Sequence, residues 1–166
     1  MKRIVLENLR SAYNVGNIVR TADALWRWVV RVGYTARADH KQVRKTSLWA
    51  EEHIPKMEFE SISSFLSSLG EPLTCEAGRC PQDRGSIKKF STLIVAELTS
   101  KSISLTDYGD KDYQWEVFLV VWNEVTGVEQ ETLDAADAII HIPMLGLKES
   151  LNVWQAAAIM MWELAK

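Results

Sequence analysis

The chain has 166 residues, of which 47% are hydrophobic and 25% are charged. This is the composition of one ordinary globular domain. No apolar run approaches the ~18 residues of a membrane span, and the first residues lack the long apolar stretch of a signal peptide. These features exclude a membrane protein and give no argument for export, so we expect a cytoplasmic protein with no membrane partner.

The charge is unevenly distributed along the chain. The net charge is −3, but residues 1–56 hold 11 Lys/Arg against 5 Asp/Glu, and residues 57–166 hold 8 against 17. A basic half is suited to meet phosphate groups while the acidic half faces elsewhere. Chance clustering of charge on a solvated surface is the alternative, and charge alone does not separate the two.

Short apolar runs alternate with helical patterns, which predicts an α/β fold with a mostly parallel sheet and helices on both faces. The runs TLIVAEL and EVFLVV are continuously apolar, as strands covered on both faces are. In chain order we expect a strand over Arg3–Glu7, a helix over Asn17–Leu25, a strand over Val29–Val32, a helix over Ser61–Leu69, strands over Thr92–Leu98 and Glu116–Val121, a helix over Gln130–Ala136, a strand over Ala138–Ile142 and a helix over Ser150–Ala165.

The segment between Gly70 and Lys89 has two prolines, two glycines and no clear period. It predicts a surface excursion and not a domain boundary, so we expect a single domain over residues 1–166. Its two cysteines, Cys75 and Cys80, are expected to be free thiols. No metal site is predicted, because the three histidines of the chain are scattered.

Three segments place polar residues and glycines after predicted strands, where open α/β sheets bind ligands. In the first, NVGNIVRTA over residues 14–22, Asn14 and Gly16 are expected in a loop and Asn17 at a helix N-cap. Arg20 then lies about one turn into the helix, where it can bind a phosphate or a ribose through forked hydrogen bonds. A turn followed by a helix cap explains the same residues without any ligand.

The second and third segments lie in the last third of the chain. WNEVTGV over residues 122–128 follows a predicted buried strand and places Glu124 just past its end. IPMLGLKESLNV over residues 142–153 joins a strand to a helix that opens with Ser150 and Asn152. Main-chain N–H groups at a helix start attract polar or anionic groups, although Ser150 is also an ordinary N-cap. Taken singly, each segment is explained by local structure.

Taken together, the segments resemble the SpoU/TrmH-type RNA methyltransferases of the SPOUT superfamily. That family carries, in this order, an N-x-G-N-(I)-x-R-T-A segment, a G-N-E-x-x-G turn and an I-P-M-x-G-x-x-x-S-L-N-V segment before a final helix. The stretch ELTSKSISLTDY over residues 97–108 also looks like the family's stretch after its middle strand. The resemblance covers nearly the whole chain and is weakest over residues 70–91.

The resemblance implies a C-terminal deep trefoil knot, the SPOUT fold, whose loops bind S-adenosyl-L-methionine. It also implies a homodimer whose active site is completed across the interface. The implied reaction transfers a methyl group from the sulfonium to a ribose 2′-hydroxyl and needs no metal. The implied catalytic residues are Arg20, Asn17, Glu124, Ser150 and Asn152. The implied cofactor-binding residues are Val121, Trp122, Asn123, Glu124, Gly127, Ile142, Met144, Leu147 and Leu151.

Arg20 is the activating residue that the family's pattern implies. Arginine rarely loses its proton, so we expect Arg20 to bind the adjacent phosphate and stabilise the developing alkoxide. The implied partner is RNA, with tRNA favoured over rRNA, and no extra RNA-binding domain is evident. The candidate RNA-binding residues are Asn14, Arg10, Arg20, Arg37, Lys41, Arg44 and Lys45. A nucleotide-binding domain of another type is disfavoured, because the chain lacks G-x-G-x-x-G and the P-loop pattern.

The tryptophans depart from the family's pattern. Trp26, Trp49 and Trp122 stand where the family usually has Gly, and Trp154 stands where a small residue is usual. Gly permits positive φ and close ligand approach, whereas Trp permits neither. One interpretation is a catalytically impaired RNA-binding relative with a Trp-blocked cofactor pocket. The other is a codon that means Gly in the source organism, as UGA does under a variant code, translated as Trp. In either case the chain as written is expected to bind cofactor weakly or not at all.

Overall fold

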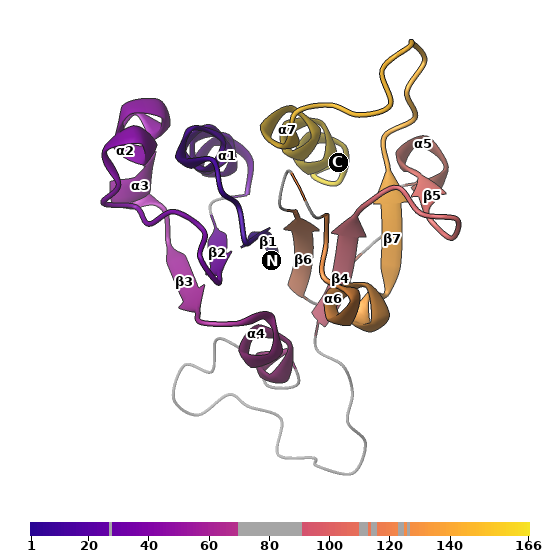
Figure 1. The fold of residues 1–166 in the computed structure, drawn as a ribbon, viewed down its shortest axis with the longest axis horizontal. Helices are drawn as coiled ribbons and strands as arrows, with labels where there is room; N and C mark the ends of the chain where they lie inside the picture. The colour runs from indigo at the N-terminus through magenta and orange to yellow at the C-terminus, as the bar shows by residue number, and fades with distance from the viewer. Residues whose placement is uncertain (27, 70–90, 110–112, 114–115, 123–124, 126) are drawn as a thin grey trace.

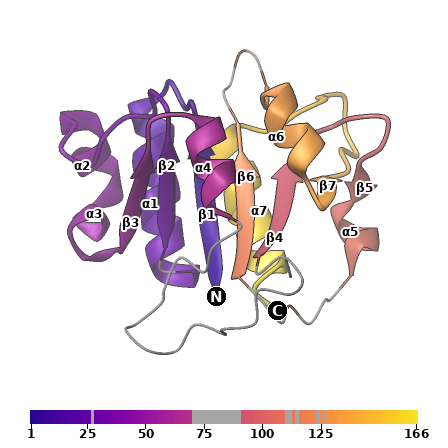
Figure 2. The same cartoon turned by 90° about the horizontal axis from the view of Figure 1, so that it is seen from below.

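The computed structural model describes residues 1–26, 28–69, 91–109, 113, 116–122, 125 and 127–166. Its centre is a seven-stranded sheet in the order β3-β2-β1-β6-β4-β7-β5 (Figures 1 and 2). Every pairing between the described strands is parallel. The strands are β1 (Lys2–Glu7), β2 (Val29–Val32), β3 (Lys56–Phe59), β4 (Ser91–Ala96), β5 (Ile103–Ser104), β6 (Glu116–Val121) and β7 (Ala138–His141).

Helices cover both faces of this sheet. Figure 1 shows α1, α2, α3 and α7 on one face and α4 and α6 on the other, with α5 at the β5 edge. The helices are α1 (Ala12–Leu25), α2 (Lys41–Ser47), α3 (Ala50–His53), α4 (Ile62–Ser68), α5 (Leu105–Tyr108), α6 (Gln130–Ala135) and α7 (Val153–Glu163). The predicted α/β architecture with helices on both faces is confirmed.

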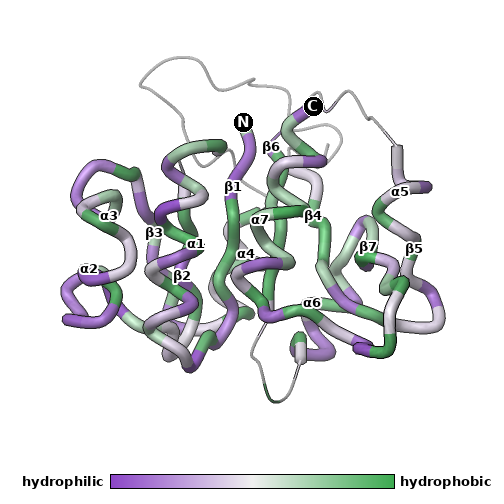
Figure 3. Tube along the Cα trace, turned by 90° about the horizontal axis from the view of Figure 1, so that it is seen from above, coloured by the Kyte–Doolittle hydropathy of each residue, from purple (hydrophilic) through white to green (hydrophobic). Residues whose placement is uncertain are grey.

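The sheet separates two hydrophobic cores. Alternate residues of one strand enter different cores, because successive side chains point to opposite faces. In β6, Leu119 packs with α1 and α7, whereas Phe118 packs against Phe65 of α4 with their ring centroids 5.5 Å apart. The central strands are hydrophobic along most of their length (Figure 3). This burial on both faces explains why β4 and β6 were readily predicted from continuous apolar runs.

Two strands enter the sheet between strands that precede them in the sequence. β6 lies between β1 and β4, and β7 lies between β4 and β5. Since all of these strands are parallel, the carboxyl ends of β4, β6 and β7 meet at one edge of the sheet. This edge is where open α/β sheets place their ligands.

The first helix begins earlier than predicted. Asn17 was predicted as its N-cap, but α1 starts at Ala12 and the Ser11 hydroxyl caps it by accepting the Asn14 N–H at 3.3 Å. The predicted loop at Asn14 and Gly16 is therefore helix. Gly16 serves close packing instead, because a Cβ there would lie 2.6 Å from the main-chain oxygen of Val43 in α2.

The last helix begins later than predicted. α7 starts at Val153, and the Asn152 side chain caps it by accepting the Trp154 N–H at 3.1 Å. Ser150 lies outside the helix, in the exposed loop before it. Asn152 is the N-cap and its side chain satisfies the N–H of Trp154, so the proposed N-cap role of Ser150 is wrong.

Several short elements had not been predicted: α2, α3, β3, β5 and α5. Strand β3 alternates exposed and half-buried residues, and β5 has two residues at the sheet edge. Neither has the apolar run that made the central strands recognisable. The predicted excursion between Gly70 and Lys89 lies outside the described residues. None of the described helices is both long and apolar enough to cross a membrane.

Candidate active site

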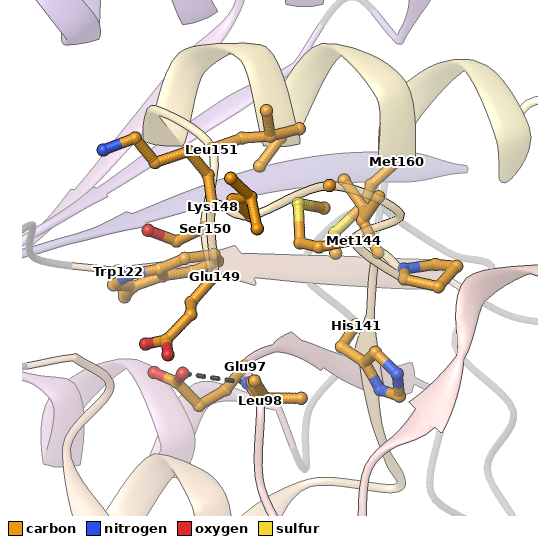
Figure 4. Close-up of a pocket in the computed structure, with 15 residues that line it drawn as sticks. Glu97, Leu98, Trp122, His141, Met144, Lys148, Glu149, Ser150, Leu151 and Met160 are labelled. Atoms are coloured by element: carbon orange, nitrogen blue, oxygen red, sulfur yellow. Dashed lines mark hydrogen bonds between the residues drawn. The ribbon is translucent and has the colours of Figure 1, made fainter.

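A pocket of about 670 Å³ opens at the carboxyl edge of the sheet. Its walls come from the segments that follow β4, β6 and β7, together with α7 (Figure 4). The lining residues are Glu97, Leu98, Trp122, His141, Ile142, Pro143, Met144, Gly146, Leu147, Lys148, Glu149, Ser150, Leu151, Ala156 and Met160. A volume of this size is typical of a site for a small molecule or cofactor.

The pocket has an apolar side and a charged side. Met144 and Met160 lie on the apolar side (Figure 4). On the charged side, the carboxylates of Glu97 and Glu149 point toward each other beside the Trp122 indole (Figure 4). Such a lining can hold a flat apolar group and a positively charged group at the same time.

The Glu97 carboxylate is fixed by main-chain hydrogen bonds. The Leu98 N–H donates to Oε1 at 2.9 Å, and the Val128 N–H donates to Oε2 at 3.3 Å. Gly127 has φ +72°, and a Cβ there would lie 2.9 Å from Glu97 Oε2. Glycine is therefore required at 127, both for its left-handed backbone and for the space that the carboxylate takes.

A second carboxylate holds the neighbouring residue of the same segment. Glu7, at the end of β1, accepts the Glu129 N–H at 2.8 Å and the Thr132 hydroxyl at 2.8 Å. Glu7 is buried, and this burial raises its pKa above the ordinary 4.5, although the bond from the Glu129 N–H opposes the shift. Asn8 adds a third contact by donating to the Glu129 side chain at 2.6 Å.

His141 ends β7 at the wall of the pocket. Its Nδ1 lies 3.0 Å from the Ser102 hydroxyl, which also lies 2.9 Å from the Thr99 main-chain oxygen. A hydroxyl has one proton to give. When Ser102 donates to Thr99, His141 Nδ1 carries the proton of the shared bond and Nε2 is left as an acceptor.

Most of the predicted cofactor-binding residues come together in this pocket. Trp122, Ile142, Met144, Leu147 and Leu151 line it, as does Ser150 from the predicted catalytic set. Val121 is buried at the end of β6, and Gly127 contacts the lining residue Glu97. Asn123 and Glu124 lie outside the described residues.

The predicted residues of the first motif lie elsewhere. Asn17 and Arg20 are on α1, away from the described residues that line the pocket in the same chain. Arg20 is exposed, and Asn17 donates to the Tyr13 main-chain oxygen at 3.0 Å. Asn152 is the α7 cap described above. One chain therefore does not bring Arg20 to the pocket.

The predicted RNA-binding residues also lie on the α1–α3 side of the molecule. Arg10, Arg37, Lys41, Arg44 and Lys45 are exposed. Asn14 is 5% exposed, so its side chain is covered in the single chain.

Two of these arginines have acidic neighbours. Arg44 lies 3.0 Å from Glu52 and 3.7 Å from Glu51, and Arg37 lies 3.8 Å from Glu58. The pKa of Glu58 is lowered first by its hydrogen bond from Arg31. The paired arginines have less free charge to offer a phosphate than the exposed lysines at 41 and 45.

The four unusual tryptophans occupy different environments. Trp49 is 72% exposed with φ +73°, a backbone that glycine adopts at little cost. Trp26 has φ −116°, is buried, and donates its indole N–H to the Met161 main-chain oxygen at 2.9 Å. Trp154 is half-buried against the α1–α7 core, and Trp122 contacts both cores. The backbone therefore favours glycine at 49, whereas Trp26 is built into the core.

Several pocket residues had not been predicted, notably Glu97, His141 and Glu149. Glu97 directly follows the apolar run of β4, as Glu124 follows that of β6. The predicted strand over Thr92–Leu98 contained Glu97, so the rule that selected Glu124, a carboxylate just past a strand, did not find it; β4 ends at Ala96.

Comparison with known proteins gives a consistent family. A protein of Staphylococcus haemolyticus assigned to the TrmH family of tRNA/rRNA methyltransferases is 28% identical over 161 residues, which is 96% of this chain and 56% of that protein. The chain thus spans about half the length of the curated relatives it matches.

Solved structures share the fold. An AdoMet-bound rRNA methyltransferase from Sinorhizobium meliloti superposes with a TM-score of 0.81 at 22% identity, covering 98% of this chain and 55% of that one. A structure solved in work on 2-OH methylation of C/U34 on tRNA has a TM-score of 0.74 at 21% identity, covering 99% and 93%. The model of the SpoU rRNA methylase family matches residues 1–162, and the chain belongs to that family.

Proposed function

We propose that this protein is an S-adenosylmethionine-dependent RNA methyltransferase that transfers a methyl group to a ribose 2′-hydroxyl, with tRNA favoured over rRNA as substrate. The observation that carries the proposal is the pocket where β4, β6 and β7 end, lined by the segment IPMLGLKESL that also carries the family resemblance. The structure solved in work on 2-OH methylation of tRNA, matched over most of both chains, supports the choice of reaction and substrate.

The pocket fits S-adenosylmethionine, the methyl donor of SpoU methyltransferases. Its volume of about 670 Å³ lies in the range of small-molecule sites. The apolar side, with Met144 and Met160, suits a flat base, and the carboxylate of Glu149 suits the positive charge of the cofactor. Ser150, exposed on the lining loop, is available for hydrogen bonding at the reacting end.

Arg20 is proposed to act from a second copy of the chain. It is exposed on α1 and lies outside the pocket of its own chain. Next to α1, helix α7 exposes 43% of Ile159 and 61% of Trp162, large apolar side chains that a homodimer would cover. In such a dimer, Arg20 binds the phosphate beside the target ribose and stabilises the developing alkoxide, and most of the rate comes from positioning.

The proposed family fold includes a C-terminal trefoil knot. The insertion of β6 between β1 and β4, and of β7 between β4 and β5, supports a chain path of that kind. We also propose that RNA is bound by this single domain, through the exposed basic residues of α2 and its surroundings, without a metal.

The alternative function is an RNA-binding relative whose cofactor pocket is blocked by Trp122. The half-buried indole lines the pocket, yet about 670 Å³ stays open beside it. This volume favours the active enzyme over the blocked relative.

The test is mass spectrometry of tRNA and rRNA from cells with and without the gene. The expected result is the loss of one 2′-O-methyl mark, restored by the parent protein and not by Arg20→Ala. An unchanged set of 2′-O-methyl nucleotides would contradict the proposed function.

A further inference from the structure

Two consecutive main-chain N–H groups of the segment after β6 are bound by carboxylates from the two strands that flank β6. Val128 donates to Glu97, at the end of β4, and Glu129 donates to Glu7, at the end of β1. β6 lies directly between these two strands. The segment that leaves β6 is therefore held from both sides just before α6 begins at Gln130.

The two carboxylates differ in what they hold. Glu97 is also a pocket residue, and its second oxygen binds the N–H of Leu98, the next lining residue. It thus connects the pocket wall after β4 to Gly127 and Val128 after β6. The second oxygen of Glu7 binds the buried Thr132 hydroxyl, and neither residue is among those that line the pocket.

We infer that Glu97 is a positioning residue of the cofactor pocket: it holds Leu98 and Val128 in place through their N–H groups and thereby sets the affinity for S-adenosylmethionine. The inferred role of Glu97 is indirect, since it acts through the two main-chain N–H groups that its oxygens bind. The inference rests on the proposed function only in naming the ligand.

The groups that Glu97 and Glu7 bind predict that the change of Glu to Gln has unequal effects at the two positions. Glu97→Gln leaves one acceptor oxygen for two N–H donors, and its new amide group faces an N–H that cannot accept. Glu7→Gln keeps an acceptor for the Glu129 N–H, and its amide group can donate to Thr132, whose hydroxyl both donates and accepts. Loss of a hydrogen bond to a charged group is costly, so Glu97→Gln has the larger effect.

The experiment measures amide hydrogen exchange by NMR at Leu98, Val128 and Glu129 in the parent, Glu97→Gln and Glu7→Gln, without ligand. The matched control is Glu60→Gln, the same chemical change at an exposed carboxylate outside the pocket. In Glu97→Gln one of the two N–H groups, that of Leu98 or that of Val128, loses its acceptor, and we expect its exchange to rise about tenfold. A smaller change is expected at Glu129 in Glu7→Gln. Unchanged exchange at both Leu98 and Val128 in Glu97→Gln would overturn the inference.

Calorimetric titration with S-adenosylmethionine and with its demethylated product then tests the link to the pocket. A positioning role predicts that Glu97→Gln weakens both ligands by a similar factor of about ten. If Glu97→Gln weakens the binding of S-adenosylmethionine alone and exchange at Leu98 and Val128 stays normal, Glu97 recognises the sulfonium charge directly. That result would overturn the inference. If the parent binds neither ligand although Glu97→Gln accelerates exchange at Leu98 or Val128, the proposed cofactor is wrong and the positioning contact stands.

Gly127→Ala provides an independent variant in case Glu97→Gln does not fold. Its Cβ would approach Glu97 Oε2 to 2.9 Å and displace the carboxylate. The same acceleration at Val128 is expected. Normal exchange at Val128 in folded Gly127→Ala would contradict the proposed contact.

Discussion

The two halves of the sheet carry different parts of the proposed site. The β1–β3 half, with α1 and α2, presents exposed basic residues and Arg20. The β4–β7 half, with α7, holds the pocket. In the β1–β3 half, the proposed RNA contacts are exposed side chains. In the β4–β7 half, the pocket wall consists of main-chain segments that carboxylates hold in place. The difference predicts that RNA contact and cofactor binding are separable by substitution, and under the proposed function the site is complete only when the two halves of different chains meet.

The sharpest test of this separation is Arg20→Ala. Methyl transfer should fall by far more than tenfold, while affinity for S-adenosylmethionine stays nearly unchanged, because Arg20 lies outside the pocket of its own chain. Single-turnover methyl transfer and calorimetry measure the two quantities. Activity within tenfold of the parent, a barrier change below about 1.4 kcal/mol, would contradict the assigned role.

Trp122→Gly tests the pocket half alone. The indole lines the pocket and packs against both cores. The blocked relative predicts that overpacking of about 1–3 kcal/mol is relieved and that affinity for S-adenosylmethionine rises roughly tenfold to a hundredfold. The proposed active enzyme predicts a smaller rise, because about 670 Å³ is already open beside the indole. Trp154→Gly is the matched control and should help less, because Trp154 is outside the lining. Equal affinities of parent and Trp122→Gly would show that the indole leaves the ligand space free.

Substitutions on α7 test the proposed homodimer, in which the halves of two different chains meet. Ile159→Glu combined with Trp162→Glu places charge on the exposed apolar side of this helix and should convert a dimer to a monomer at micromolar concentration. Methyl transfer should fall with dimer content. Light scattering measures the mass, and Leu48→Glu, at an exposed leucine in the α2–α3 turn, serves as the control. A parent that is already monomeric would remove the proposed role of the second copy.

The basic half is tested by the salt dependence of RNA binding. Lys45→Ala should lower the slope of log affinity against log salt concentration by about 1, as loss of one phosphate contact does. Arg44→Ala should lower it less, because Arg44 lies beside Glu51 and Glu52. Filter binding over a range of salt concentrations gives both slopes. Equal slopes for the parent and Lys45→Ala would exclude Lys45 from the RNA contact.

The smallest expected effect concerns pH. Because the pKa of Glu7 is raised above 4.5, the folded protein keeps this proton to higher pH than the unfolded chain does. The contribution of protonated Glu7 to the free energy of unfolding is fully present below the pKa of Glu7 in the unfolded chain. It is lost as pH rises through the pKa of Glu7 in the folded protein. Relative to the parent, Glu7→Gln should therefore gain thermal stability as pH rises above the ordinary Glu pKa of 4.5. Thermal unfolding of both proteins over this pH range measures the difference in their stability. A difference that does not change with pH, or that changes in the opposite direction, would contradict the raised pKa of Glu7.

The elements that the sequence predicted well are those whose environment is uniform. β4 and β6 are buried on both faces, so their residues are apolar without interruption. The start of α1 was misplaced because Ser11, Asn14 and Asn17 all have side chains that can cap a helix. Tertiary packing decides between them: Gly16 must lie within the helix for α1 to approach α2.

The pocket was predicted in outline because its loop carries a long motif. Its charged side was missed because Glu97 acquires its role through Val128, a partner 31 residues away. No local pattern records such a contact. The residues of the first motif did not by themselves predict that Arg20 lies outside the pocket of its own chain; only the family resemblance implied a site completed across an interface.

The position of β6 has a consequence for how the protein is made. β6 pairs with β1 from Lys2↔Val117 to Leu6↔Val121. The residues of β1 therefore pair with residues that lie more than a hundred positions later in the sequence. During synthesis, one edge of β1 is open while everything up to that point emerges from the ribosome. Long-range parallel pairing slows folding, and open strand edges favour association between chains. The strand that leads to Trp122 in the pocket is thus also the one that joins β1 to β4 late in synthesis.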